Sequence, residues 1–181
     1  RLGPATGPAV DPRGAGPSVR IEQEMKAVPV GKAQLRRSGR RIALLAFGTM
    51  LGAALEAGEA LDATVVNMRF VKPIDAAAIR ELAGAHDVLV TLEENALIGG
   101  AGSEVARALE GAAPARLVRI GLPDQFVDHG EQSQLLASVG LDAAGILERL
   151  ARDGVPVASQ IAVGQSNIAS FPDGIRKKEG A

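Results

Sequence analysis

The chain has 181 residues and a formal net charge of −1, with 46% hydrophobic and 23% charged residues, as in ordinary globular domains. Because it has no cysteine, disulfides, thiolate catalysis and Cys-ligated zinc or iron–sulfur sites are excluded. The near-zero charge gives no indication of binding to nucleic acid or to an acidic membrane, and no apolar run reaches the length of a membrane span.

The first 26 residues predict a linker, since glycines alternate there with Pro4, Pro8, Pro12 and Pro17. The chain opens on Arg1, so we expect a fragment whose preceding domains lie upstream. Residues 27–152 predict a compact domain. Residues 153–181 lose the apolar period and contain a basic stretch, which predicts a disordered tail.

In the compact part, apolar strands alternate with helices. Val30–Leu35 predicts an antiparallel edge strand, where the neighbouring Pro29 is tolerated. The elements that follow are a strand over 41–47, a helix over 50–61, a strand over 64–70, a helix over 76–85 capped by Asp75, a strand over 87–93, a helix that Gly99–Gly102 opens and that runs to Leu109, a strand over 115–120, and helices over 131–139 and 142–151 separated by Gly140. This alternation predicts an α/β fold with a three-layer, mostly parallel five-stranded sheet and one antiparallel strand.

A glycine-rich turn, Gly99–Gly102, stands between a predicted strand and a helix, where backbone N–H groups can hold a phosphate. Its pattern is neither GxGxxG nor a GK[ST] loop, and Glu93 and Glu94 at its entry would repel an anion. Close packing of helix on strand is therefore favoured. The two glutamates point to opposite faces of a strand, which favours helix capping or an interdomain contact over an acid–base pair.

Two histidines and two basic residues are further candidates for a catalytic or binding role. His86 lies in a helix-to-strand turn, where we expect it to be solvated, while His129 lies in a loop at a strand's carboxyl end. A lone histidine is a weak signal, and neither belongs to a Ser-His-Asp or HExxH pattern. Arg69 and Lys72 flank the end of the second predicted strand. They would bind an anion or, as is more common, keep their charged ends in solvent.

Seven segments together resemble the C-terminal third of the 1-deoxy-D-xylulose-5-phosphate synthases, which are thiamine-diphosphate enzymes of the transketolase superfamily. The matching text is PRG at 12–14, PVGKAQLRRSGRRIALLAFGTM at 29–50, MRFVKPID at 68–75, VTLEEN at 90–95, GGAGSEV at 99–105, IGLPDQFVDHG at 120–130 and GLDAAGI at 140–146. The resemblance implies a transketolase C-terminal-like domain over 27–152. It also implies that 1–26 is a linker or the remnant of a preceding pyrimidine-binding domain.

The resemblance implies that the full-length enzyme condenses pyruvate with glyceraldehyde 3-phosphate, releases carbon dioxide and forms 1-deoxy-D-xylulose 5-phosphate, a precursor of isoprenoids, thiamine and pyridoxal. Thiamine diphosphate and Mg²⁺ would be held by the preceding domains of the same polypeptide. This chain would then contain no catalytic, cofactor-binding or metal-binding residue, and its domain would serve as scaffold and interface.

One residue of the chain gains a chemical role from the resemblance. Arg13 would reach the phosphate of the acceptor substrate, because a guanidinium binds phosphate with two parallel hydrogen bonds. The family has an aromatic residue where Asp11 stands here, which places a negative charge beside the expected anion. A homodimer in the bacterial cytoplasm, or in a plastid stroma, is also implied.

Three alternatives remain. The first is the C-terminal half of a transketolase or of a 2-oxo acid dehydrogenase beta subunit, which share the strand–turn–helix pattern. The second is a stand-alone, non-catalytic binding or assembly module. The third is an independent phosphate- or nucleotide-binding α/β protein that uses the Gly99–Gly102 turn.

Overall fold

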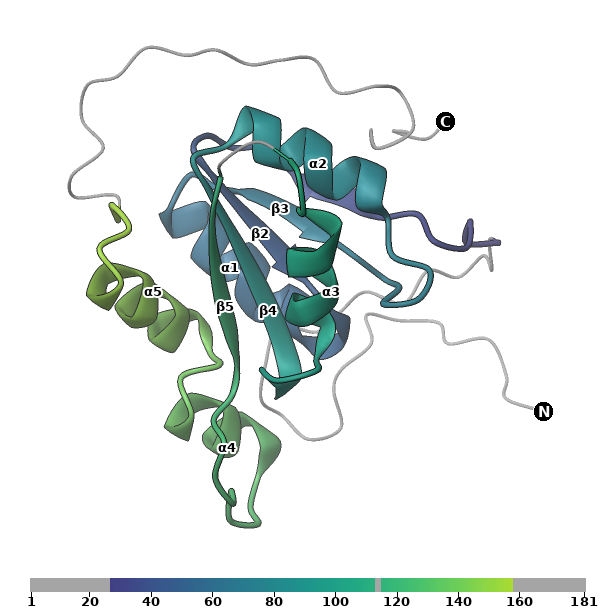
Figure 1. Ribbon diagram of the computed structural model, residues 1–181. Coiled ribbons are helices and arrows are strands. Elements are labelled where there is room, and N and C mark those ends of the chain that lie inside the picture. Colours follow the sequence, from purple (N-terminus) through teal and green to yellow (C-terminus); the bar gives the residue numbers. More distant parts are fainter. Residues whose placement is uncertain (1–26, 113–114, 158–181) are drawn as a thin grey trace, which may run out of the picture.

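The computed structural model describes residues 27–112 and 115–157 (Figure 1). The elements are β1 (Gln34–Arg37), β2 (Ile42–Ala46), the 3-10 turn η1 (Gly48–Met50), α1 (Leu51–Ala60), β3 (Thr64–Asn67), α2 (Ala76–Ala85), β4 (Val88–Ala96), α3 (Ala101–Ala108), β5 (Arg116–Leu122), α4 (Gln132–Ser138) and α5 (Ala143–Arg152). None of the helices in these two stretches is long and apolar enough to cross a bilayer.

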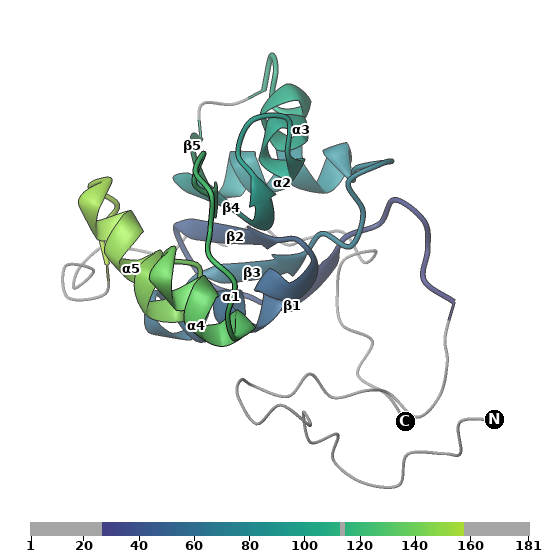
Figure 2. The same cartoon turned by 90° about the horizontal axis from the view of Figure 1, so that it is seen from below.

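The strands form one sheet in the order β1-β3-β2-β4-β5. Strands β2 to β5 run parallel, and β1 runs antiparallel to β3, with Gln34 opposite Asn67. Seen along the sheet, α2 and α3 cover one face, and α1, α4 and α5 lie on the other (Figure 2). The predicted three-layer α/β fold with one antiparallel strand is therefore confirmed.

Each face of the sheet carries its own core. Leu44 and Val90 pack with α1 and α5 on one side, while Leu45 and Leu89 pack with α2 and α3 on the other. Strand β2 is buried along its whole length, as expected for a central parallel strand with both faces covered. Aliphatic side chains fill both cores almost alone, with Phe47 as the one buried aromatic among the described residues.

The antiparallel strand β1 begins at Gln34, four residues later than the predicted start at Val30. Gly31 has a φ of +70° and packs against Pro73, so the chain turns there before the strand begins. Both terminal strands of the sheet expose arginines: Arg36 on β1, and Arg116 and Arg119 on β5. Pairing between β1 and β3 is also interrupted by a register shift between Leu35 and Arg37.

Among the other strands, β3 and β4 differ most from their predicted ends. Strand β3 ends at Asn67 instead of Phe70, because Arg69 has a φ of +60°, which ends an extended strand. Strand β4 continues beyond the predicted Glu93 to Ala96, which pairs with Leu122 after a register shift. Helix α2 has its predicted bounds. Asp75 caps it by accepting the Ala78 N–H at 3.2 Å, as expected.

The predicted domain bounds of 27–152 stay a prediction. The linker at 1–26 and residues 158–181 of the predicted tail lie outside the described residues.

Candidate functional site

The parallel strands end together at the carboxyl end of the sheet, where ligands of open α/β folds bind. Strands β3 and β4 lie on opposite sides of β2, so the strand order reverses between β2 and β4. Glu94 lies on β4 at this point with an exposed side chain. Thr49 Oγ1 donates to Glu94 Oε2 at 2.6 Å, and Gln132 Nε2 lies 3.3 Å from both carboxylate oxygens. Glu94 thus links η1, β4 and α4.

The neighbouring Glu93 points to the other face of the sheet and is almost completely buried. One carboxylate oxygen accepts the Ala101 N–H at 2.6 Å, and the other accepts the Gly102 N–H at 2.8 Å. These N–H groups begin α3, where a negative charge is favoured by the helix dipole. The expectation that one of the two glutamates caps a helix is confirmed for Glu93.

This capping decides what the Gly99–Gly102 turn can do. The N–H groups that would hold a phosphate already donate to Glu93, and the Gly99 N–H lies 3.2 Å from Ser103 Oγ. A Cβ on Gly102 would lie 2.8 Å from Thr91 Oγ1 and 2.9 Å from Glu93 Oε1. The glycines therefore serve close packing of α3 on β4, and the geometry disfavours the turn as a nucleotide site.

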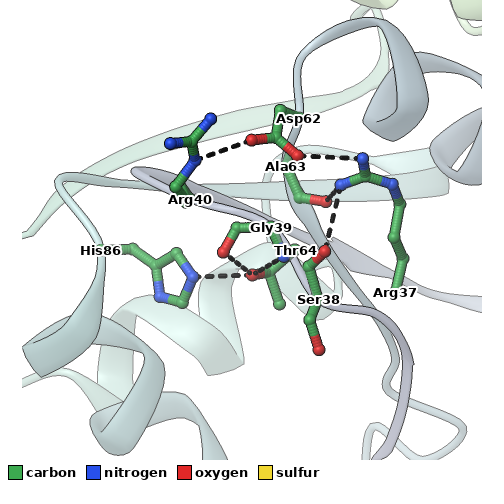
Figure 3. A network of polar contacts seen from close by, with 8 residues as sticks. All are labelled: Arg37, Ser38, Gly39, Arg40, Asp62, Ala63, Thr64 and His86. Atoms are coloured by element: carbon green, nitrogen blue, oxygen red, sulfur yellow. Dashed lines mark hydrogen bonds and ion pairs between the residues drawn. The ribbon is translucent and has the colours of Figure 1, made fainter. Parts of the chain in front are cut away.

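His86 lies at the amino end of the sheet and is buried, which makes the expectation of a solvated side chain wrong. Its Nδ1 lies 3.0 Å from the Leu82 carbonyl oxygen, which can only accept, so Nδ1 carries the proton. Its Nε2 then accepts from Thr64 Oγ1 at 2.8 Å, while Thr64 Oγ1 accepts the Gly39 N–H at 3.0 Å (Figure 3). Burial lowers the pKa of His86, although the bond to Leu82 acts in the opposite direction.

An ionic cluster lies beside this network (Figure 3). Arg40 Nε donates to Asp62 Oδ2 at 2.8 Å, and Arg37 Nη2 donates to Asp62 Oδ1 at 3.1 Å. Hydrogen bonds from Arg40 and then from Arg37 lower the pKa of Asp62. The cluster joins the β1–β2 turn to the turn before β3 at the amino end of the sheet.

The remaining predicted residues are scattered. Arg69 and Lys72 follow β3 at the carboxyl end, and His129 is exposed in the loop between β5 and α4. His86 lies at the opposite end of the sheet, so the two histidines do not form one site. Arg13 and Asp11 lie outside the described residues. Within 27–112 and 115–157, no group of three His, Asp or Glu side chains is placed to hold a metal ion.

The exposure of two large apolar side chains was not predicted from the sequence. Phe126 and Ile98 lie fully or largely in solvent, in the loops that follow β5 and β4. The signal available was an apolar residue between turn-forming residues, as in Pro123-Asp124-Gln125-Phe126, but nothing in that pattern distinguishes an exposed side chain from a buried one.

Comparison with known proteins gives one matching family model, described as "Transketolase, C-terminal domain", over residues 31–146. Two curated relatives named 1-deoxy-D-xylulose-5-phosphate synthase are 63% identical over 142 residues (Aromatoleum aromaticum) and 64% identical over 137 residues (Azoarcus sp.). The match covers 78% and 75% of this chain but only 23% and 22% of those proteins, so the chain spans about a quarter of their length.

A solved structure titled "Split gene transketolase, inactive beta4 tetramer" is 32% identical, with a TM-score of 0.64. The similarity covers 73% of this chain and 45% of that one.

Proposed function

The chain belongs to the transketolase C-terminal domain family, and we propose that it is the C-terminal domain of a 1-deoxy-D-xylulose-5-phosphate synthase. The observation that carries the proposal is the identity of 63–64% to two proteins of that name over most of the described residues. Within a synthase, the domain would contribute scaffold and interface, and the reaction would join pyruvate to glyceraldehyde 3-phosphate.

Thiamine diphosphate would supply the carbanion chemistry of such an enzyme. The described residues do not fit the cofactor. The N–H groups at the start of α3, the natural place for a diphosphate, donate to Glu93, and the nearby carboxylates would repel an anion. No step of the reaction is therefore assigned to this domain. In the proposal, the cofactor and Mg²⁺ are held by preceding domains of the same polypeptide, in a dimeric cytoplasmic enzyme.

Arg13 is the residue of this chain that we propose to touch substrate. Its guanidinium would bind the phosphate of glyceraldehyde 3-phosphate with two hydrogen bonds, and Asp11 would lie close enough in sequence to weaken that attraction. Loss of a charged hydrogen-bonding partner costs about 1.5–3 kcal/mol, which corresponds to about 10- to 100-fold in affinity.

A chimera tests the proposal directly. The segment of the Aromatoleum aromaticum synthase that matches this chain is replaced by the 181 residues, and formation of 1-deoxy-D-xylulose 5-phosphate is measured. We expect product. In the same chimera, Arg13→Ala should raise KM for glyceraldehyde 3-phosphate about 10- to 100-fold and leave KM for pyruvate unchanged. A folded chimera that forms no product would contradict the proposal.

The similarity to the split-gene transketolase keeps one second candidate, the C-terminal half of a transketolase. The same chimera assayed for two-carbon transfer between sugar phosphates, without release of carbon dioxide, distinguishes the two reactions.

A further inference from the structure

The segment between β5 and α5 is attached to the rest of the domain by few contacts. Residues 123–140 comprise the loop after β5, helix α4 and the turn that follows it, and none of these residues is buried. The residues on both sides of the segment are fixed, since Leu122 pairs with Ala96 in the sheet and Leu141 is buried in the core. We call residues 123–140 the strap. The strap extends past the ends of the neighbouring strands (Figure 1).

Helix α4, the regular part of the strap, has little stability of its own. It has seven residues, and isolated helices shorter than about 12–15 residues are marginal in water. Its N-cap residue, Glu131, makes no side-chain capping hydrogen bond, whereas Asp142 caps α5 by accepting the Gly145 N–H at 2.8 Å. Helix α4 also buries no residue, while α5 buries Ile146 and Leu150. The order of α4 therefore depends on its contacts with the rest of the domain.

Two kinds of contact hold the strap against the domain. Leu136 and Val139 are half-buried and pack against the core that contains α1 and α5. The other contact is polar, because Gln132 Nε2 lies 3.3 Å from both oxygens of Glu94, whose Oε2 also accepts from Thr49 Oγ1 at 2.6 Å. Among the described residues, Gln132 makes the one hydrogen-bonded link between the strap and the sheet. We call Thr49, Glu94 and Gln132 the latch.

Charge attraction does not strengthen the latch. The strap contains no lysine or arginine, and its acidic residues carry the same charge as Glu94. The hydrogen bonds that the carboxylate of Glu94 accepts come from the neutral side chains of Thr49 and Gln132. Because Glu94 and Gln132 are exposed, water competes for these bonds and reduces what they contribute. The free energy that keeps the strap closed is therefore small compared with the stability of the sheet.

From these observations we propose that the strap opens and closes as one unit while the sheet stays folded, and that the latch keeps it closed. Opening breaks the link from Gln132 to Glu94 and exposes Leu136 and Val139 together, because all these contacts belong to one short helix. It also frees the carboxylate of Glu94 at the place where the strand order reverses, which is where ligands of open α/β folds bind. The inference does not rest on the proposed function, because each contact that it uses lies within the described residues.

Residue-resolved hydrogen exchange, measured by NMR on the 181-residue chain, tests the opening. The N–H groups of Leu135 and Val139, which donate to the carbonyl oxygens of Glu131 and Leu135, report on the strap. Those of the buried strand β2 report on the sheet. We expect exchange in the strap to be about 100-fold faster than in β2, or more, and to be insensitive to low urea concentrations, since a local opening exposes little surface. Equal rates in the strap and in β2 would mean that the strap opens only with the whole domain, which would overturn the proposal.

Substitutions in the same experiment test the latch. Gln132→Ala should accelerate exchange in the strap about two- to fivefold and leave β2 unchanged. Gln134→Ala is the matched control, because Gln134 is exposed two residues further along the same helix and should affect neither rate. Glu94→Ala should act like Gln132→Ala, and the double variant should show no larger effect than either single variant.

The remaining outcomes are equally clear. If Gln132→Ala and Gln134→Ala have the same effect, or if the effects of Glu94→Ala and Gln132→Ala simply multiply, the two residues do not act through one contact and the latch is refuted. Unchanged exchange in β2 shows that each variant is folded. Product formation by the chimera has no part in this experiment, so the proposal of an opening strap and the proposed function can fail separately.

Discussion

Removing the carboxylate of Glu93 should destabilise the domain more than any other single change among its acidic residues. The side chain is 2% exposed, and its two oxygens accept the first free N–H groups of α3 at 2.6 and 2.8 Å. A hydrogen bond to a charged acceptor contributes about 1.5–3 kcal/mol, and the burial of Ala101 and Gly102 keeps their N–H groups from finding another acceptor readily. The desolvation cost of a buried carboxylate offsets part of this gain.

We therefore expect Glu93→Ala to lower the free energy of unfolding by about 3 kcal/mol. Glu93→Gln keeps one acceptor oxygen but turns an amide N–H₂ towards a backbone donor, so it should cost about 2 kcal/mol. Urea unfolding followed by circular dichroism measures both values. For a domain of this size, 3 kcal/mol corresponds to a melting temperature lower by about 6–12 °C.

Glu94→Gln is the matched control, because Glu94 is the next residue of the same strand and is exposed. Its substitution should change stability by less than about 1 kcal/mol. If Glu93→Gln and Glu94→Gln had the same small effect, the reasoning that Glu93 is an obligatory cap of α3 would be refuted.

Three further predictions concern stability. Burial lowers the pKa of His86 from its ordinary value of 6.5, so the folded state favours the neutral imidazole. The urea midpoint of unfolding should therefore be constant above pH 6.5 and fall as the pH drops below that value. The substitution His86→Gln should flatten this pH dependence. The lowered pKa of Asp62 contributes stability that is present above the ordinary pKa of 3.8 and is lost as the pH falls through the pKa of the folded state. Because Asp62 is 45% exposed, Asp62→Asn should lower the free energy of unfolding by no more than about 1 kcal/mol at pH 7. A larger loss in urea unfolding would contradict this expectation. Gly100→Ala should lower the melting temperature, because the added Cβ would overlap the Ala96 carbonyl oxygen and the Glu93 carboxylate, and an unchanged value would mean that the turn shifts freely.

Local signals in the sequence were sufficient for most of the fold. The run from Ile42 to Ala46 predicts a buried central strand, and Asp75 before an alanine-rich segment predicts a capped helix, because both depend on neighbouring residues. The burial of His86 could not be predicted, since its partners Thr64 and Gly39 are distant in sequence and meet it only in the assembled sheet.

The candidate site was predictable only in part. The alternation of a strand separates Glu93 from Glu94, but which of them reaches the start of α3 depends on how the helix packs on the sheet. The exposure of Phe126 depends on the direction of its loop, and hydrophobic periodicity in the sequence does not predict the direction of a loop. Arg13 owes its proposed role entirely to family resemblance.

The arginines on the two outermost strands limit how this domain can associate. An unpaired edge strand can form hydrogen bonds with a strand of another molecule, and this pairing is a common start of aggregation. On β1, Arg36 lies where pairing is already irregular, and on β5, Arg116 and Arg119 would bring like charges together if two such borders paired. The addition of further strands is therefore disfavoured at both edges of the sheet. A nascent chain carrying this domain should consequently resist fibrous self-assembly.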